Sequence, residues 1–224
     1  MLRKALAGAL GLALMSGTAF AATQVSSTDY GLAAPAGTVL VDFNGGNLNG
    51  FTLTGNYAFV NSSVSGQYAA PADSPTTQTT TDYLVVPGQG VDGYADLWSA
   101  TGYQSVSFLW GSIDNYNDVQ LLDAAGNVFG TLFNGDDPNI ADPNADGGQF
   151  GAATNRRVFF TQQAGDPLIY GIRFSNHGAR AFEIENVAFG AVPEPTTWAM
   201  LIAGFGLVGG AMRRRRTSTT MVTA

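Results

Sequence analysis

Val119-Gln-Leu-Leu-Asp-Ala-Ala-Gly-Asn-Val-Phe-Gly-Thr-Leu-Phe133 is the stretch that decides the fold class. Two apolar segments, 119–122 and 128–133, flank the turn-forming residues 123–127. Short apolar segments on either side of a turn rich in Asp, Gly and Asn are typical of a β-hairpin. The stretch therefore predicts two antiparallel strands joined by a short turn.

Similar short segments recur through the chain, separated by turn-forming residues. In 105–110, Val106, Phe108 and Trp110 alternate with their neighbours, as in a strand with one face in the core. Residues 51–60 predict a second hairpin, with a two-residue turn at Gly55-Asn56. The remaining expected strands are 38–43, 83–86, 157–160, 168–174 and 182–189.

Residues 22–191 contain no convincing amphipathic helix. Many short strands, abundant glycine and no helices favour an all-β domain, an antiparallel jelly-roll-like β-sandwich at 38–191. Residues 22–37 are rich in Ser, Ala and Gly and are expected to form a flexible leader. The run Thr76-Thr-Gln-Thr-Thr-Thr81 is expected to be a loop.

The N-terminus has the pattern of a secretory signal peptide. Arg3 and Lys4 precede an apolar run at 5–15, and Ala19 and Ala21 form a small-x-small cleavage box. We expect residues 1–21 to be removed. The apolar run is shorter than the roughly 17–25 residues of a membrane span, which argues against an uncleaved anchor.

The C-terminus combines a rigid segment, an apolar run and a cationic cluster. Pro193, Glu194 and Pro195 precede Trp198, residues 199–212 carry no charge, and the cluster is Arg213, Arg214, Arg215 and Arg216. An interfacial Trp and cytoplasmic arginines predict a transmembrane helix at 198–212. Because Lys and Arg stay on the cytoplasmic side, everything between the two ends is expected to be exported.

The segment Val192-Pro-Glu-Pro-Thr-Thr-Trp-Ala-Met200, its apolar run and the cluster at 213–216 resemble the PEP-CTERM sorting signal in its PEPxxWA form. The resemblance covers 192–216 and leaves a tail at 217–224. It implies that an exosortase, a membrane cysteine protease of Gram-negative bacteria, cuts near Pro193-Glu194-Pro195. Transient insertion in the inner membrane and delivery to the cell surface or extracellular matrix are implied as well.

The domain also loosely resembles a common ectodomain type of PEP-CTERM proteins. The resemblance rests on Trp110-Gly-Ser-Ile-Asp-Asn-Tyr-Asn117, Leu121-Leu-Asp-Ala-Ala-Gly126 and Ala181-Phe-Glu-Ile-Glu-Asn-Val187. It implies a β-sandwich and brings no established biochemical activity.

Charge and composition exclude several function classes. Residues 22–191 carry four arginines and 16 Asp and Glu, a formal charge of −12. An acidic surface repels nucleic acid, so no nucleic-acid partner is expected. The chain has no cysteine and one histidine, which excludes disulfides, a thiolate site and a His-based zinc cage.

Ca²⁺ is the one cofactor that the sequence suggests. Asp142, Asn144 and Asp146 with Gly147 match the first half of a calcium loop, but position twelve is Ala153 instead of an acid. The alternative is an acidic turn. A second candidate pairs Asp42 on the first strand with Glu185, or its neighbour Glu183, on the last, because a metal can fasten chain ends.

Catalysis is not expected from this sequence. Glu183 and Glu185 share a face of a strand, but they are interpreted as solvated carboxylates. Glycan hydrolysis is a remote alternative. Five aromatic residues are candidates for stacking on sugars, with core packing as the alternative: Tyr94, Trp98, Tyr103, Tyr116 and Tyr170.

The sequence thus predicts an exported, non-enzymatic surface protein with a structural or adhesive role in an exopolysaccharide matrix. A calcium-dependent carbohydrate-binding module is the alternative. Exosortase and the inner membrane are the expected partners during sorting, and polysaccharide is the candidate ligand.

Overall fold

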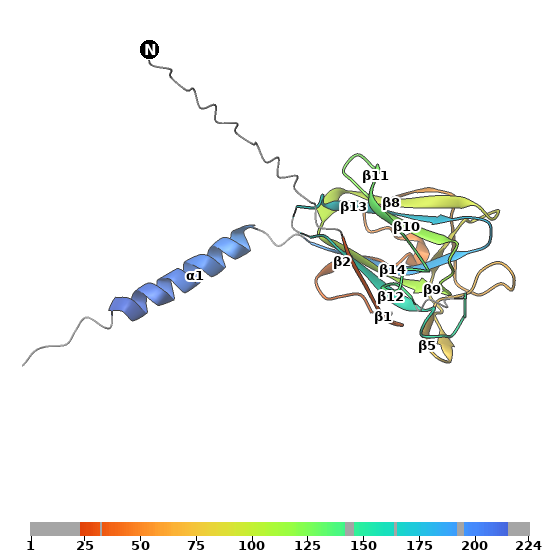
Figure 1. Cartoon of the computed structure of the whole chain (residues 1–224), viewed down its shortest axis with the longest axis horizontal. Coiled ribbons are helices and arrows are strands. Elements are labelled where there is room, and N and C mark those ends of the chain that lie inside the picture. Colours follow the sequence, from red (N-terminus) through yellow and green to blue (C-terminus); the bar gives the residue numbers. More distant parts are fainter. Residues whose placement is uncertain (1–22, 32, 142–145, 164, 192–194, 215–224) are drawn as a thin grey trace, which may run out of the picture.

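The computed structural model describes residues 23–31, 33–141, 146–163, 165–191 and 195–214 (Figure 1). The signal peptide, Asp142, Asn144, Pro193, Glu194, Arg215 and Arg216 lie outside these residues. The strands are β1 Gln24–Asp29, β2 Thr38–Val41, β3 Thr52–Gly55, β4 Ala58–Val60, β5 Ala72–Ser74, β6 Thr77–Gln78, β7 Tyr83–Val86, β8 Gly93–Tyr103, β9 Ser105–Gly111, β10 Asn117–Leu122, β11 Val128–Asn134, β12 Arg156–Thr161, β13 Ile169–Asn176 and β14 Phe182–Gly190. A 3₁₀ turn, η1, covers Asn44–Gly46, and α1 is Pro195–Arg214.

The strands form antiparallel sheets, which confirms the all-β prediction. One sheet has seven strands in the order β1-β12-β9-β14-β7-β4, with β2 also paired to β14. The second has five strands in the order β11-β10-β13-β8-β3, and β5 and β6 form a small two-stranded sheet. The chain therefore passes repeatedly from one large sheet to the other between consecutive strands.

The two large sheets bury one shared core. Val106, Phe108 and Trp110 of β9 are buried, as their alternation predicted. The Phe108 ring packs edge-on against Phe174 of β13 in the other sheet, at 5.1 Å between centroids. Phe51 packs against Phe189 of β14 at 4.6 Å. Aromatic contacts of this kind add to the free energy gained from burial, so they help to hold the layers together.

The outer face of the seven-stranded sheet is covered by residues 61–81, which we call the strap. It contains β5 and β6 and connects β4 to β7. Tyr83 and Val85 of β7 pack under it in a second apolar cluster with Ala70 and Ala181. The central strands of this sheet are therefore buried on both faces, which explains why Leu109 is as buried as its core-facing neighbours.

Of the two predicted hairpins, one is confirmed and one is wrong. β10 and β11 pair around the predicted turn, with Leu122 opposite Val128. By contrast, β3 pairs with β8 and β4 pairs with β7, in different sheets. Gly55 lies between them at φ +111°, and a β-carbon there would overlap the backbone of β8. The chain crosses between the layers at this point instead of folding back on itself.

The predicted flexible leader is also wrong where the structure describes it. Residues 24–29 form β1, an edge strand paired in full register with β12. Arg156 of β12 binds Asp29 at 2.5 Å and donates to Ser27 at 2.9 Å. In this pairing, β1 satisfies the backbone hydrogen-bonding groups at the edge of β12. The apolar pattern of the sequence does not reveal such a pairing.

The predicted C-terminal helix is present as α1 and contains the segment 198–212. Within the described residues, no helix is both long enough and apolar enough to cross a membrane. Insertion of this segment in a membrane stays a prediction.

Candidate functional site

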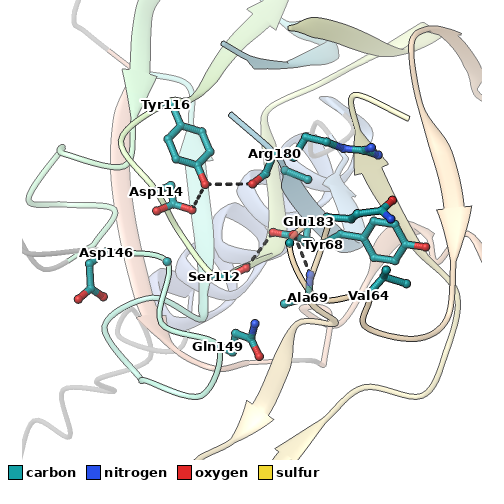
Figure 2. A pocket seen from close by; sticks show the side chains of 14 residues that line it. Val64, Tyr68, Ala69, Ser112, Asp114, Tyr116, Asp146, Gln149, Arg180 and Glu183 are labelled. Atoms are coloured by element: carbon teal, nitrogen blue, oxygen red, sulfur yellow. Dashed lines mark hydrogen bonds between the residues drawn. The ribbon is translucent and has the colours of Figure 1, made fainter. Parts of the chain in front are cut away.

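A cavity of about 280 Å³ opens between the strap and one end of the seven-stranded sheet (Figure 2). Its wall combines four segments that are far apart in the sequence: the strap, the loop after β9, the loop before β12 and the start of β14. The residues that line it are Val64, Gly66, Gln67, Tyr68, Ala69, Ser112, Asp114, Tyr116, Asp146, Gly147, Gln149, Arg180, Ala181 and Glu183. Most of these residues carry a polar side chain.

Glu183 lies at the inner end of the cavity. It belongs to β14 and is 2% exposed. One carboxyl oxygen, Oε1, accepts a hydrogen bond from the backbone N–H of Ala69 at 3.0 Å, and Oε2 accepts one from Ser112 Oγ at 2.8 Å. Burial raises the pKa of Glu183 to about 8, although these two bonds favour its ionised form. At neutral pH the carboxyl is therefore mainly protonated.

Asp114 and Tyr116 form a second polar pair at the cavity wall. The Tyr116 hydroxyl lies 2.5 Å from Asp114 Oδ2 and 3.2 Å from the carbonyl oxygen of Arg180 (Figure 2). Burial raises the pKa of Asp114, the hydrogen bond from Tyr116 opposes this, and the charge of Asp146 adds to the rise. Burial and the same hydrogen bond raise the pKa of Tyr116, so its hydroxyl stays a donor.

Gly147 fits closely against Asp114. Its φ is +73°, and a β-carbon there would lie 2.7 Å from Asp114 Oδ1. Its backbone N–H also donates to the carbonyl of Ile113 at 3.1 Å. Only glycine combines this backbone conformation with this approach, so residue 147 fixes the distance between the two walls of the cavity.

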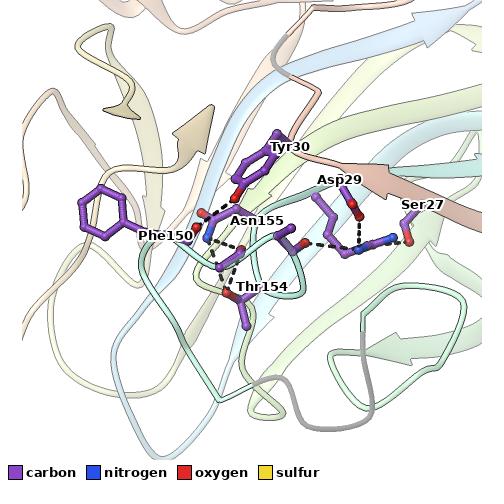
Figure 3. Close-up of polar contacts among 9 residues, drawn as sticks. Ser27, Asp29, Tyr30, Phe150, Thr154 and Asn155 are labelled. Atoms are coloured by element: carbon purple, nitrogen blue, oxygen red, sulfur yellow. Dashed lines mark hydrogen bonds and ion pairs between the residues drawn. The ribbon is translucent and has the colours of Figure 1, made fainter. Parts of the chain in front are cut away.

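Asn155 joins three of the four segments that build the cavity. Its Oδ1 accepts hydrogen bonds from the backbone N–H of Ala72 in the strap at 2.9 Å and of Ser112 at 3.3 Å. Its Nδ2 donates to the carbonyls of Gly148 at 3.0 Å and Gly151 at 3.1 Å, and Thr154 also donates to Gly148. Figure 3 shows Asn155 next to Thr154 within this group of polar contacts. Because Asn155 is fully buried, these hydrogen bonds are shielded from water. They hold the three segments of the cavity wall in a fixed arrangement.

The chemistry of the cavity suits a ligand rich in hydroxyl groups. Carboxyl, amide and phenol side chains can each donate to or accept from a sugar hydroxyl. Among the described residues, no group of three or more His, Asp and Glu is arranged to hold a metal ion. The cavity is thus a candidate binding site whose wall offers hydrogen bonds.

The predicted metal ligands that the structure describes each make contacts of their own. Asp146 is exposed at the rim of the cavity, while Asp142 and Asn144 lie outside the described residues. β2 pairs with β14, so the first of the expected strands does lie beside the last. However, Asp42 accepts a bond from the N–H of Asn44 at 3.2 Å, whereas Glu185 accepts bonds from Thr79 and Thr81 of the strap.

The interpretation of Glu183 and Glu185 as solvated carboxylates is wrong. They share a face of β14 as expected, but both are buried, at 2% and 1% exposed. The reason is the strap, which covers the face that an isolated sandwich would show to water. The sequence signal for this arrangement is weak, because the strap is held largely by hydrogen bonds to these side chains and carries few large apolar residues.

The aromatic residues predicted to bind sugars lie in four different places. Tyr103 is a core residue stacked on Phe51, and Tyr116 lines the cavity. Tyr170 is half-buried. Tyr94 and Trp98 alternate along the outer face of β8, where Tyr94 is 47% exposed.

The exposed Tyr94 ring is part of a rigid group. The Arg173 guanidinium lies 4.3 Å from the centre of the ring and is held by Asp96 through two bonds of 2.7 Å. Such a flat aromatic and cationic surface is a second place where a sugar could stack. The sequence identified the aromatic residues here, but it gave no sign of the Arg173–Asp96 pair that fixes them.

The comparisons with known proteins identify one segment of the chain. The family described as the PEP-CTERM protein-sorting motif matches residues 191–216. No curated protein matches the chain.

Two solved structures are similar to the chain at low identity. One is the enzymatically active domain of tailspike protein 4 of bacteriophage CBA120, with 15% identity, a TM-score of 0.34 and coverage of 67% of this chain. The match spans only 20% of the tailspike chain. The other is the K2 cleaved adhesin domain of Lys-gingipain, with 13% identity, a TM-score of 0.22 and coverage of 71% of this chain and 97% of that one. Likenesses this weak assign neither a fold family nor an activity.

Proposed function

We propose that this chain, which carries a PEP-CTERM protein-sorting motif at residues 191–216, is sorted by exosortase to the cell surface or extracellular matrix of a Gram-negative bacterium. The observation that carries the proposal is the position of the motif. It begins one residue after β14 ends at Gly190. The folded domain and the sorting signal are therefore adjacent, and cutting near Pro193-Glu194-Pro195 would release the domain with only a short extension.

The ectodomain is proposed to be a jelly-roll-like β-sandwich. The strand order supports this assignment. β7, β14, β9 and β12 are neighbours in one sheet, and β8, β13, β10 and β11 follow in the corresponding order in the other. Two four-stranded sheets that interleave in this way are the core of a jelly roll, here extended by β1, β2, β3 and β4.

The role that best fits this domain is structural or adhesive. An acidic surface keeps the exported domain soluble, and the rigid group at Tyr94, Arg173 and Asp96 offers a stacking surface for polysaccharide. β14, which would lie next to the new C-terminus, pairs with β9, β7 and β2. Attachment through so central a strand would pass a pulling force into the middle of the sheet.

The test compares cells that express the wild-type chain with cells that express a variant with Gln at 213–216. If the arginines hold the precursor in the inner membrane for exosortase, the variant should lose cell-surface material on immunoblots of fractionated cells. Replacing Thr217, Ser218, Thr219 and Thr220 with Ala, just beyond the cluster, is the matched control and should leave sorting unchanged. Equal surface levels of all three chains would contradict the proposal.

The second candidate function is calcium-dependent carbohydrate binding, and the polar cavity favours it. The measurement is electrophoresis in gels containing matrix polysaccharide, with Ca²⁺ or with EDTA. Binding should retard the wild-type chain with Ca²⁺, and Asp114→Asn should migrate faster than Asp136→Asn, a control at an exposed position away from the cavity. Identical mobility with and without polysaccharide would count against this function.

A further inference from the structure

A second buried acidic site lies beneath the strap, apart from the cavity. Glu185 of β14 is 1% exposed, and its Oε1 accepts hydrogen bonds from the hydroxyls of Thr79, at 3.0 Å, and Thr81. Its other oxygen, Oε2, is buried and has no hydrogen-bond partner among the residues that the structure describes. A carboxylate oxygen that has left water without a partner costs several kcal/mol. This oxygen is therefore an acceptor that the described residues leave unused.

Asp73 of β5 presents a second oxygen of the same kind. Its Oδ1 is also buried, and no described residue donates a hydrogen bond to it. Asp73 lies next to the strap residues that contact Glu185, because the N–H of Thr79 donates to the carbonyl of Pro71 at 2.8 Å. Burial raises the pKa of Glu185, and the charge of Asp73 adds to that rise, so the two carboxyls lie within electrostatic reach. Two buried acceptors that have no donor among the described residues thus lie within electrostatic reach of each other.

The nearby cation does not fill this role. Arg157 of β12 is buried, and its charge lowers the pKa of Glu185 in opposition to burial. Its guanidinium nevertheless donates to Gly31 O at 2.6 Å, to Ser107 Oγ at 3.1 Å and to Asn186 O at 3.2 Å. These are neutral oxygens. Neither Glu185 Oε2 nor Asp73 Oδ1 accepts a hydrogen bond from Arg157.

We propose that Asp73 and Glu185 bind one hard divalent cation, Ca²⁺, together with the hydroxyl oxygens of Thr79 and Thr81. Ca²⁺ prefers carboxylate and other oxygen ligands and tolerates irregular geometry, which suits two carboxylates and two hydroxyls completed by backbone oxygens or water. The ion would act as the positively charged partner of Asp73 Oδ1 and Glu185 Oε2, which have no hydrogen-bond partner among the described residues. It would fasten the strap to β14 in a chain without cysteines.

This site differs from the pair that the sequence suggested, because Asp73 takes the place of Asp42. It does not rest on the proposed sorting or on sugar binding at the cavity. Its consequence is mechanical: the ion joins the strap to the sheet, so its loss would loosen the wall of the cavity without removing any residue that lines it.

The test uses the full-length chain in detergent. The chain is first treated with EDTA, and the EDTA is then removed. Isothermal titration with CaCl₂ should show one ion per chain. At a Ca²⁺ concentration about 100 times Kd, the Tm should rise by roughly 5–10 °C. Asp73→Asn should weaken Ca²⁺ affinity at least about tenfold, and Glu185→Gln should abolish binding. Asp82→Asn, next to Thr81 but half-buried and accepting a hydrogen bond from the N–H of Gly45, is the matched control and should bind as the wild type does.

Several outcomes would overturn the proposal. The first is a wild-type chain that binds no Ca²⁺ and whose Tm is the same with Ca²⁺ and with EDTA. Such a result would mean that the two carboxyls share a proton. The second is loss of binding in Asp114→Asn with binding kept in Asp73→Asn, which would place the ion in the cavity. If Glu185→Gln does not fold, Thr81→Val replaces it and should also weaken Ca²⁺ binding.

Discussion

Replacing Glu183 with Gln should make the protein more stable at alkaline pH. Burial raises the pKa of the Glu183 carboxyl from its ordinary value of 4.5 to about 8 in the folded chain. Below pH 4.5 this carboxyl is protonated in both the unfolded and the folded chain, so its burial does not lower the free energy of unfolding through a change of charge. As the pH rises, the unfolded chain releases this proton first, so folding stability falls until the folded carboxyl also ionises near pH 8. Glutamine has a similar shape and does not titrate.

The size of the effect follows from the two pKa values. One pKa unit is worth about 1.36 kcal/mol, so the interval from 4.5 to about 8 corresponds to at most about 5 kcal/mol. The amide oxygen of Gln can still accept from the N–H of Ala69, and its NH₂ group can donate to Ser112 Oγ. Wild type and variant should thus have free energies of unfolding within about 1 kcal/mol of each other near pH 4.5. Near pH 8.5 the variant should be more stable by several kcal/mol.

The assay is urea unfolding of both chains from pH 4.5 to pH 9, followed by tryptophan fluorescence. Asp136→Asn, at an exposed carboxyl, is the control and should follow the wild-type curve. If Glu183→Gln differs from the wild type by a constant amount at every pH, Glu183 does not titrate in this interval. The account of the buried carboxyl would then be refuted.

Further substitutions test the core, the crossover and the edge strand. Trp110→Ala should lower the free energy of unfolding by about 3–5 kcal/mol, whereas Trp110→Phe should cost far less because the buried indole N–H has no partner among the described residues. Gly55→Ala should destabilise more than Gly126→Ala in chemical denaturation. Both have positive φ, but only at Gly55 would a β-carbon overlap backbone. Asp29→Asn, which removes the exposed ion pair with Arg156, should change stability by less than about 1 kcal/mol in the same assay.

The strands that the sequence predicted are those with a clear apolar pattern. The hairpin around Asp123 is present because its turn chemistry is local: Asp123 Oδ1 accepts from the N–H groups of Ala125 and Asn127. β9 is present because its large side chains Val106, Phe108 and Trp110 alternate on the face that packs into the core between the two large sheets. The sequence missed β1, whose Gln-Val-Ser-Ser-Thr-Asp pattern resembles a loop and whose pairing depends on an edge of β12 that is distant in the chain.

The cavity could not have been predicted from the sequence, because its wall is assembled by long-range polar contacts. Asn155 joins the strap to the ends of two loops, and nothing in its local sequence distinguishes it from a surface asparagine. Glu183 and Glu185 look like surface carboxylates for the same reason, since the strap that buries them carries few large apolar residues. The sorting segment is the opposite case: residues 191–216 are recognised from their order in the chain alone.

The most direct test of the central claim is the intact mass of the protein recovered from the surface of native cells. The account predicts a chain that begins near Ala22 and ends near Pro193-Glu194-Pro195, without the segment from Trp198 onward. A surface product that still carries residues 198–224 would contradict it.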